Sequence, residues 1–150
     1  MKKITLLFLF AIAVSGFSWS QCGPGPSGQY PSGTITVDSS GDVTAISGCN
    51  YSSEFSVVDG IVAGNDYTVS ITLAGVDLYV TVENSADNSV IAFGASPFTF
   101  TASAGVTGVN LNWSEDAACT YVASGCRVTT IQDITAAANA CPDATGLAAS

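Results

Sequence analysis

The sequence contains no histidine, and this absence excludes several kinds of catalytic site. Serine–histidine–aspartate triads and cysteine–histidine pairs need an imidazole base, so neither forms within this chain. The G-x-S-x-G motif of hydrolases and the phosphate-binding P-loop are absent as well. Glu54, Glu83 and Glu115 could supply the carboxylate pair of a glycosidase only by chance, because acidic residues here fall mostly in turns and at outward strand positions. The sequence therefore predicts a protein that is not an enzyme.

Basic side chains are almost absent, and two of the three stand at the start of the chain, Lys2 and Lys3. A nearly unbroken apolar run occupies positions 4–14, and mostly small residues follow at positions 15–20. A charged start, a short apolar run and small residues before a cleavage point are the layout of a secretory signal peptide. We therefore expect residues 1–20 to be removed and the protein to be secreted or displayed on the cell surface.

Two other interpretations of this segment remain open. The apolar run could anchor the chain in a membrane, although it is shorter than the about 20 residues needed to span roughly 30 Å of hydrocarbon. The chain could also be a lipoprotein, because Cys22 lies just after the expected cleavage point at Ser20. The residues before Cys22, however, do not form the leucine-rich box that lipidation needs. We expect no membrane insertion once the signal peptide is cleaved.

Without the signal peptide, Arg127 is the only basic side chain beside twelve acidic ones. A surface this negative repels phosphate backbones, which excludes nucleic acid as a partner. Anionic lipid surfaces are disfavoured for the same reason. Solubility outside the cell is the ordinary role of such a charge, and cations are the ions that it would attract.

Five cysteines stand at positions 22, 49, 119, 126 and 141, all in the exported part of the chain. Disulfides form and persist outside the cytoplasm. Cys119 and Cys126 are separated by a short polar segment and could close a loop between adjacent strands. Cys22 and Cys49 are further disulfide candidates whose partners the sequence leaves open, and one of the five stays unpaired or pairs outside this chain. Zinc is disfavoured because there is no histidine and no C-x-x-C spacing.

The exported part has the composition and period of an all-β protein. Val, Thr, Ser, Gly and Ala are common and Leu is rare, which favours strands and turns. Apolar residues alternate along positions 67–74, 76–83 and 109–113, which is the period of a half-buried strand. Trp113 continues one of these apolar faces, so we expect it in the core. Shorter strands are expected at positions 34–37, 43–46, 55–57, 90–93, 98–101 and 127–132.

Several short strands with turn residues between them predict an antiparallel β-sandwich, of the jelly-roll or CUB-like kind, over residues 21–133. Residues 134–150 are expected to form a linker and the start of a further domain. The alanine-rich stretch 135–140 could form one turn of helix, but it is too short to be stable by itself.

Four stretches carry a resemblance to a known module: Tyr51–Phe55, Val62–Tyr67, Val90–Thr101 and Ala118–Thr130. In this order they resemble a β-sandwich module of large secreted and cell-surface proteins of Bacteroidota, including those exported by type nine secretion. Residues 77–80 are also similar to the middle strands of CUB-like and pre-peptidase C-terminal sandwiches. The resemblance implies a non-catalytic part of an adhesin, a surface layer or an exported hydrolase, and it supplies no catalytic residues.

Residues 141–150 resemble the opening strand of a fibronectin type III repeat, which commonly follows that module. This resemblance implies that other domains of the same longer chain are partners of this one. The family often carries a cysteine soon after the strand that residues 127–130 resemble, whereas here Cys141 comes later. That departure leaves the pairing of Cys49 open.

Calcium is the one candidate cofactor. It takes about six to eight oxygen ligands, and Asp66, Asp77 and Asp87 stand near strand ends and turns together with Asn84 and Asn88. No D-x-D-x-D-G loop is present, so ordinary turn chemistry is the competing explanation.

Glycans or other surface polymers are the candidate ligands. Sugar binding needs exposed aromatic rings beside polar groups, and Tyr79 points away from the apolar face of its strand. Tyr121 is the second candidate, in the loop between Cys119 and Cys126. The competing interpretation is that each tyrosine packs across strands on a half-exposed face.

These observations leave three functional hypotheses. The first is a structural or adhesive module of a multidomain secreted or cell-surface protein. The second is a carbohydrate-binding module attached to an exported hydrolase. The third is a small secreted protein that acts by itself.

Overall fold

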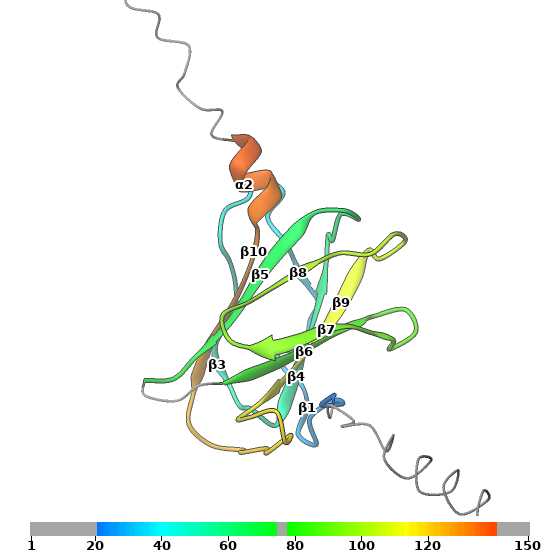
Figure 1. Cartoon of the computed structure of the whole chain (residues 1–150). Coiled ribbons are helices and arrows are strands. Elements are labelled where there is room, and N and C mark those ends of the chain that lie inside the picture. The colour runs from blue at the N-terminus through cyan, green and yellow to red at the C-terminus, as the bar shows by residue number, and fades with distance from the viewer. Residues whose placement is uncertain (1–20, 75–77, 141–150) are drawn as a thin grey trace, which may run out of the picture.

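The described residues form ten strands in two β-sheets that pack face to face, with a short helix at one end (Figure 1). The computed structural model describes residues 21–74 and 78–140. The expected signal peptide at 1–20, the calcium candidate Asp77 and the fibronectin-like stretch 141–150 lie outside them. The all-β sandwich expected from the sequence is confirmed.

Sheet A has the order β1-β4-β9-β6-β7, with β2 also beside β4. Its strands are β1 (Gly28–Gln29), β2 (Ile35–Thr36), β4 (Glu54–Asp59), β6 (Tyr79–Asn84), β7 (Val90–Ala95) and β9 (Gly108–Ser114). Neighbouring strands pair antiparallel, except that β1 and β2 run parallel to β4.

Sheet B has the order β3-β10-β5-β8, and all its pairs are antiparallel. Its strands are β3 (Thr44–Asn50), β5 (Asp66–Thr72), β8 (Phe98–Thr101) and β10 (Arg127–Asp133). After β4 the chain crosses repeatedly from one sheet to the other. Apart from the β6–β7 hairpin, the paired strands are therefore not consecutive in the sequence.

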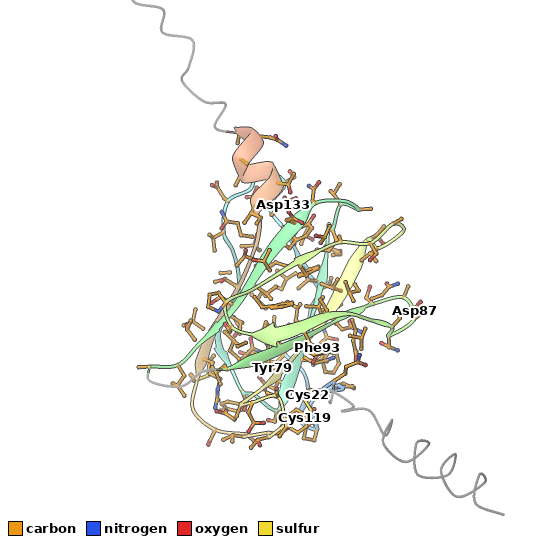
Figure 2. The ribbon with its side chains drawn as sticks, in the orientation of Figure 1. Cys22, Tyr79, Asp87, Phe93, Cys119 and Asp133 are labelled. Carbon is orange, nitrogen blue, oxygen red and sulfur yellow. A yellow bond between two sulfur atoms is a disulfide. The ribbon has the colours of Figure 1, made fainter. Side chains whose placement is uncertain are left out.

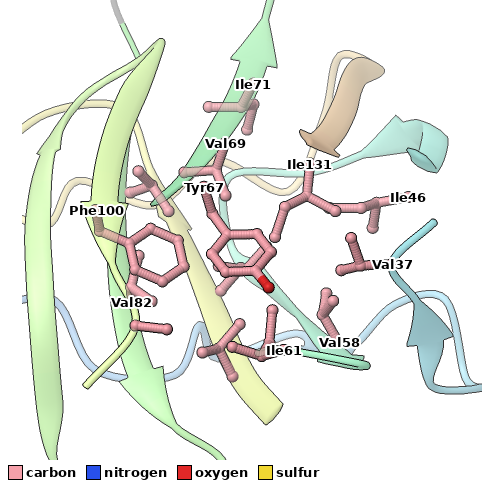
Figure 3. Close-up of a cluster of buried hydrophobic side chains, with 14 of the residues drawn as sticks. Val37, Ile46, Val58, Ile61, Tyr67, Val69, Ile71, Val82, Phe100 and Ile131 are labelled. Atoms are coloured by element: carbon pink, nitrogen blue, oxygen red, sulfur yellow. The ribbon is translucent and has the colours of Figure 1, made fainter. Parts of the chain in front are cut away.

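The inward faces of the two sheets enclose one apolar core (Figure 3). The alternation expected for β5 is confirmed, because Tyr67, Val69 and Ile71 are at most 2% exposed. Trp113 is fully buried as expected, and its Nε1–H donates to Ser56 Oγ at 3.1 Å, the polar partner that a buried indole needs. Each large apolar side chain buried in this way contributes about 1.5–3 kcal/mol.

Residues 134–140, which the sequence analysis assigned to a linker, form the helix α2 (Ile134–Ala140). Asp133 caps this helix, since its Oδ1 accepts the N–H of Ala136 at 2.8 Å. The backbone of Gly41 approaches α2 so closely that a Cβ there would lie 2.1 Å from Ala137 N, and its φ is +88°. The docked helix thus depends on the cap and on a glycine 96 residues away, which the local sequence pattern does not reveal.

The structure contains two disulfides, Cys22–Cys119 and Cys49–Cys126. The expected Cys119–Cys126 bond is therefore wrong, although all four candidate cysteines are disulfide-bonded. The register of β3 and β10 places Arg127 opposite Asn50, which brings Cys126 to the end of β3 where Cys49 lies. Two such bonds indicate an oxidising compartment, the periplasm or the cell exterior.

Among the described residues, no helix is both long enough and apolar enough to cross a lipid bilayer.

Candidate binding surface

The outer face of sheet A carries two half-buried aromatic side chains, Tyr79 of β6 and Phe93 of β7 (Figure 2). Their ring centroids are 6.4 Å apart and their planes are tilted by 36°. The register accounts for this contact, because Tyr79 lies opposite Ala95 and Phe93 is therefore its diagonal neighbour on the same face. We refer to Tyr79 and Phe93 as the aromatic pair.

Sequence reasoning identified Tyr79 and missed Phe93. Phe93 stands in the apolar run Val90–Ala95, which has no alternation to show which side chains point outward. Pairing with β6, whose alternation is clear, could have supplied that information.

Residues 22–25, which we call the N-terminal segment, cover the neighbouring part of the same face. The N–H of Cys22 donates to Thr81 Oγ1 at 3.2 Å, and the Tyr121 hydroxyl donates to the Gly23 carbonyl oxygen at 2.9 Å. As a result Thr81 has no exposed surface and Glu83 is only 7% exposed. The alternation of positions 76–83 places Thr81 and Glu83 on the outer face, but it does not predict their burial, since strand period gives the face of a side chain and not what packs on it.

Two further features show how tightly this cover is packed. A Cβ on Gly25 would lie 2.1 Å from the carbonyl oxygen of Ser53, so only glycine permits this backbone approach. Asn112, opposite Thr81 on β9, is fully buried, and its side-chain amide has no hydrogen-bond partner within the described residues. The aromatic pair is therefore the partly exposed part of this face, whereas Thr81 and Glu83 are buried beneath the N-terminal segment. We refer to Thr81 and Glu83 as the closed row.

Tyr121, the second candidate for sugar stacking, has a different role. Its hydroxyl is bonded to Gly23, and its ring makes no ring contact with Tyr79 among the described residues. Burial raises the pKa of Tyr121, and the negative charge of Glu83 raises it further. Tyr121 thus fixes the N-terminal segment in place, and the two tyrosines do not form one platform.

The glutamates considered as a catalytic pair are engaged in the fold. Glu115 forms an ion pair with Arg127, which is only 2% exposed, and accepts a hydrogen bond from Ser52 Oγ at 2.5 Å. Glu54 accepts a backbone N–H of the β3–β4 turn at 2.8 Å. Glu83 lies in the closed row. The carboxylates of Glu54 and Glu115 thus hold parts of the fold together.

The two calcium candidates that the structure describes, Asp66 of sheet B and Asp87 in a turn of sheet A, have hydrogen-bond partners of their own. Asp66 accepts a hydrogen bond from Thr101 Oγ1 at 2.6 Å on sheet B. Asp87, in the β6–β7 turn, accepts bonds from the hydroxyl and N–H of Ser89, and these bonds lower the pKa of Asp87. Over residues 21–74 and 78–140, no group of three or more histidine, cysteine, aspartate or glutamate side chains could hold a metal ion.

Comparisons with known proteins give two solved structures and no family. No family model and no curated protein matches the sequence. The structure of PliG from Aeromonas hydrophila, a periplasmic inhibitor of g-type lysozyme, is 12% identical, covers 65% of this chain and 90% of its own, and gives a TM-score of 0.42. PliG from Salmonella Typhimurium is 16% identical, covers 66% and 96%, and gives 0.32. Similarity at this level carries no argument about what the present chain binds.

Proposed function

We propose that this chain is a non-catalytic extracellular module with a structural or adhesive role in a secreted or cell-surface protein. The observation that supports the proposal is that several ionisable side chains stabilise the fold through hydrogen bonds and an ion pair. Glu54, Glu115 and Arg127 hold loops together, Asp133 caps a helix, and Asp116 closes a turn by accepting bonds from Thr120. Polar groups that serve the fold in this way suit a rigid spacer or binding domain.

The absence of histidine and the engagement of these carboxylates support a protein that is not an enzyme. The two disulfides support a role outside the cytoplasm, because disulfides form and persist in oxidising compartments. Partners in this proposal are neighbouring domains of a longer chain or polymers of the cell surface.

A second candidate function is carbohydrate binding on behalf of an exported hydrolase. The aromatic pair favours it, since adjacent half-exposed rings on a flat sheet face can stack against pyranose rings. The fold offers the rings of Tyr79 and Phe93 for this role, so recognition would rest on stacking.

Two measurements test these proposals. Sequencing the gene beyond the codon for Ser150 should reveal further sandwich domains with a surface-sorting domain if the role is structural or adhesive. A catalytic domain in the same frame would favour the carbohydrate-binding alternative.

The second measurement is binding of the purified protein to insoluble polysaccharides and to a glycan array. If the aromatic pair binds sugar, Tyr79→Ala should abolish retention, while Tyr30→Ala, at an exposed tyrosine elsewhere, should not. Retention that survives Tyr79→Ala would remove the carbohydrate proposal for this surface. Hydrolysis of any of these polysaccharides by the isolated chain would overturn the non-catalytic assignment.

A further inference from the structure

The four edge positions of the two sheets differ in how well they are protected against pairing with another chain. Beside β4, the edge strands β1 and β2 have two residues each, and β8, at one edge of sheet B, has four. The strand β3 has seven residues, but two register shifts interrupt its pairing with β10. Short and irregular edge strands are the devices by which proteins prevent strand addition.

The remaining edge strand, β7, lacks these devices over most of its length. It has six residues, Val-Ile-Ala-Phe-Gly-Ala, none of them charged and none of them proline. Its one register shift lies at the start, and the pairing from Ala92 to Ala95 is regular. Within the described part of the chain, β7 pairs with β6 alone.

The register shows which backbone groups of β7 are open. The N–H of Ser96 donates to the Leu78 carbonyl oxygen at 2.8 Å, so alternate residues back along β7, Gly94 and Ala92, bond to β6. In an antiparallel pair the residues between these positions direct their N–H and C=O groups away from the partner strand. Phe93 and Ala95 therefore present two N–H and two C=O groups at the edge of sheet A.

The side chains beside this edge fit an apolar strand residue. Phe93 points to the outer face, where it contacts Tyr79, and both rings are half-buried (Figure 2). A strand laid along β7 would place one of its outward side chains next to Phe93, at the cross-strand distance where aromatic and apolar residues stabilise each other.

We propose that β7 is a strand-addition site, which accepts an extended segment of another polypeptide as a further strand of sheet A. Its backbone bonds to Phe93 and Ala95, and an apolar side chain packs against the aromatic pair. The segment carries no acidic residues, because the exported chain has twelve acidic side chains and one basic one. The same charge disfavours a second copy of this chain. The partner is a separate polypeptide, whether or not the domain belongs to a longer protein.

Amide hydrogen exchange and peptide selection on the secreted protein test this proposal. In the free protein, the Phe93 and Ala95 amides should exchange at least about tenfold faster than those of Ala92, Gly94 and Ser96, because a paired strand protects only its bonded amides. The probe is a displayed library of random ten-residue peptides. Selected peptides should alternate apolar residues, lack Asp and Glu, and slow exchange at Phe93 and Ala95.

Two substitutions at one position separate the backbone contribution from other effects. Ala95→Pro removes an outward N–H that β6 does not use, whereas Ala95→Ser keeps it. We expect Ala95→Pro to weaken the selected peptides about tenfold or more, a change of about 1.4 kcal/mol, with an unchanged melting temperature. Ala95→Ser should stay within about twofold of the parent protein.

Several results would overturn the proposal. One is a library in which every enriched peptide binds the parent and Ala95→Pro proteins equally. Another is sugar binding that Tyr79→Ala abolishes and Ala95→Pro leaves intact, which would assign the surface to glycans. A third is self-association in sedimentation that Ala95→Pro removes, which would make a second copy the occupant.

Discussion

The two ends of the sandwich are held by different kinds of bond (Figure 2). At the disulfide end, which comprises residues 22–27, the β3–β4 turn and loop 115–126, two disulfides and the Glu115–Arg127 ion pair join segments with little apolar core of their own. At the helix end, which comprises α2, loop 38–43 and turn 60–65, the cap of Asp133 and the close approach of Gly41 hold the helix. Covalent bonds thus fix the segments that cover sheet A, and weaker bonds suffice where a helix packs on strand ends.

The largest effect is expected from the disulfides. Replacing Cys22 and Cys119 by Ser should lower the free energy of unfolding by about 4 kcal/mol, because the bond closes a long loop in the unfolded chain. Urea unfolding under non-reducing conditions measures this loss. A loss below about 1 kcal/mol would mean that the disulfide end is not held covalently in the way described.

The ion pair at the same end should rank second. Arg127→Met leaves Glu115 without its cation and should cost about 3 kcal/mol, whereas replacing both residues, in Arg127→Met with Glu115→Leu, should restore most of that stability. Thermal unfolding of the two proteins gives the comparison. Equal destabilisation by the single and the double change would show that the arginine acts through packing and its bonds to Ser124 and Gly125 instead.

How far the sequence predicts this architecture depends on the distance between interacting segments. The alternation in β5 and the burial of Trp113 follow from local period, because one face of a strand must meet the core. The burial of Thr81 and Glu83, by contrast, depends on two long-range hydrogen bonds. Cys22 is hydrogen-bonded to Thr81, 59 positions away, and Gly23 to Tyr121, 98 positions away. Local patterns carry no information on such contacts, and for the same reason the predicted Cys119–Cys126 bond is wrong.

The residues of the candidate site show the same contrast between local pattern and long-range contact. Tyr79 could be identified from the period of its own strand, but its partner Phe93 required the β6–β7 register. The open edge of β7 is likewise a property of the sheet order, since a strand at an edge and a strand in the middle have the same local pattern when both faces are apolar.

At the helix end the effect of a substitution should be smaller. Asp133→Ala removes the cap of α2 and the bond from Asn65 Nδ2, and should cost about 1–2 kcal/mol. Because the damage is local, amide exchange should accelerate in α2 while the amides of β9 and β10 near the disulfides keep their protection. Uniform acceleration over both ends would contradict the view that they are held separately.

The smallest effect is expected from mild acid, again at the helix end. Burial by itself raises the pKa of Asp133, but hydrogen bonds from Ala136 N–H, Asn65 and Tyr67 outweigh it and hold the pKa below its ordinary 3.8. A lowered pKa means that the charged carboxylate stabilises the fold above about pH 4, and that this contribution is lost as the pH falls further. Unfolding free energy measured from pH 6 to pH 2 should therefore decline below pH 4, and Asp133→Asn should flatten the decline. An identical decline in that variant would assign the acid sensitivity to other carboxylates.

Two separate disulfides fasten the N-terminal segment and loop 115–126, so that one part of sheet A is covered while the aromatic pair and β7 stay open. Disulfide mapping of the non-reduced secreted protein by mass spectrometry tests this most directly, with proteolysis after Tyr121 to separate Cys119 from Cys126. We predict linked peptides that join Cys22 to Cys119 and Cys49 to Cys126. A peptide pair joining Cys119 to Cys126 would contradict the account, because residues 22–25 would then have no covalent hold on the outer face of sheet A.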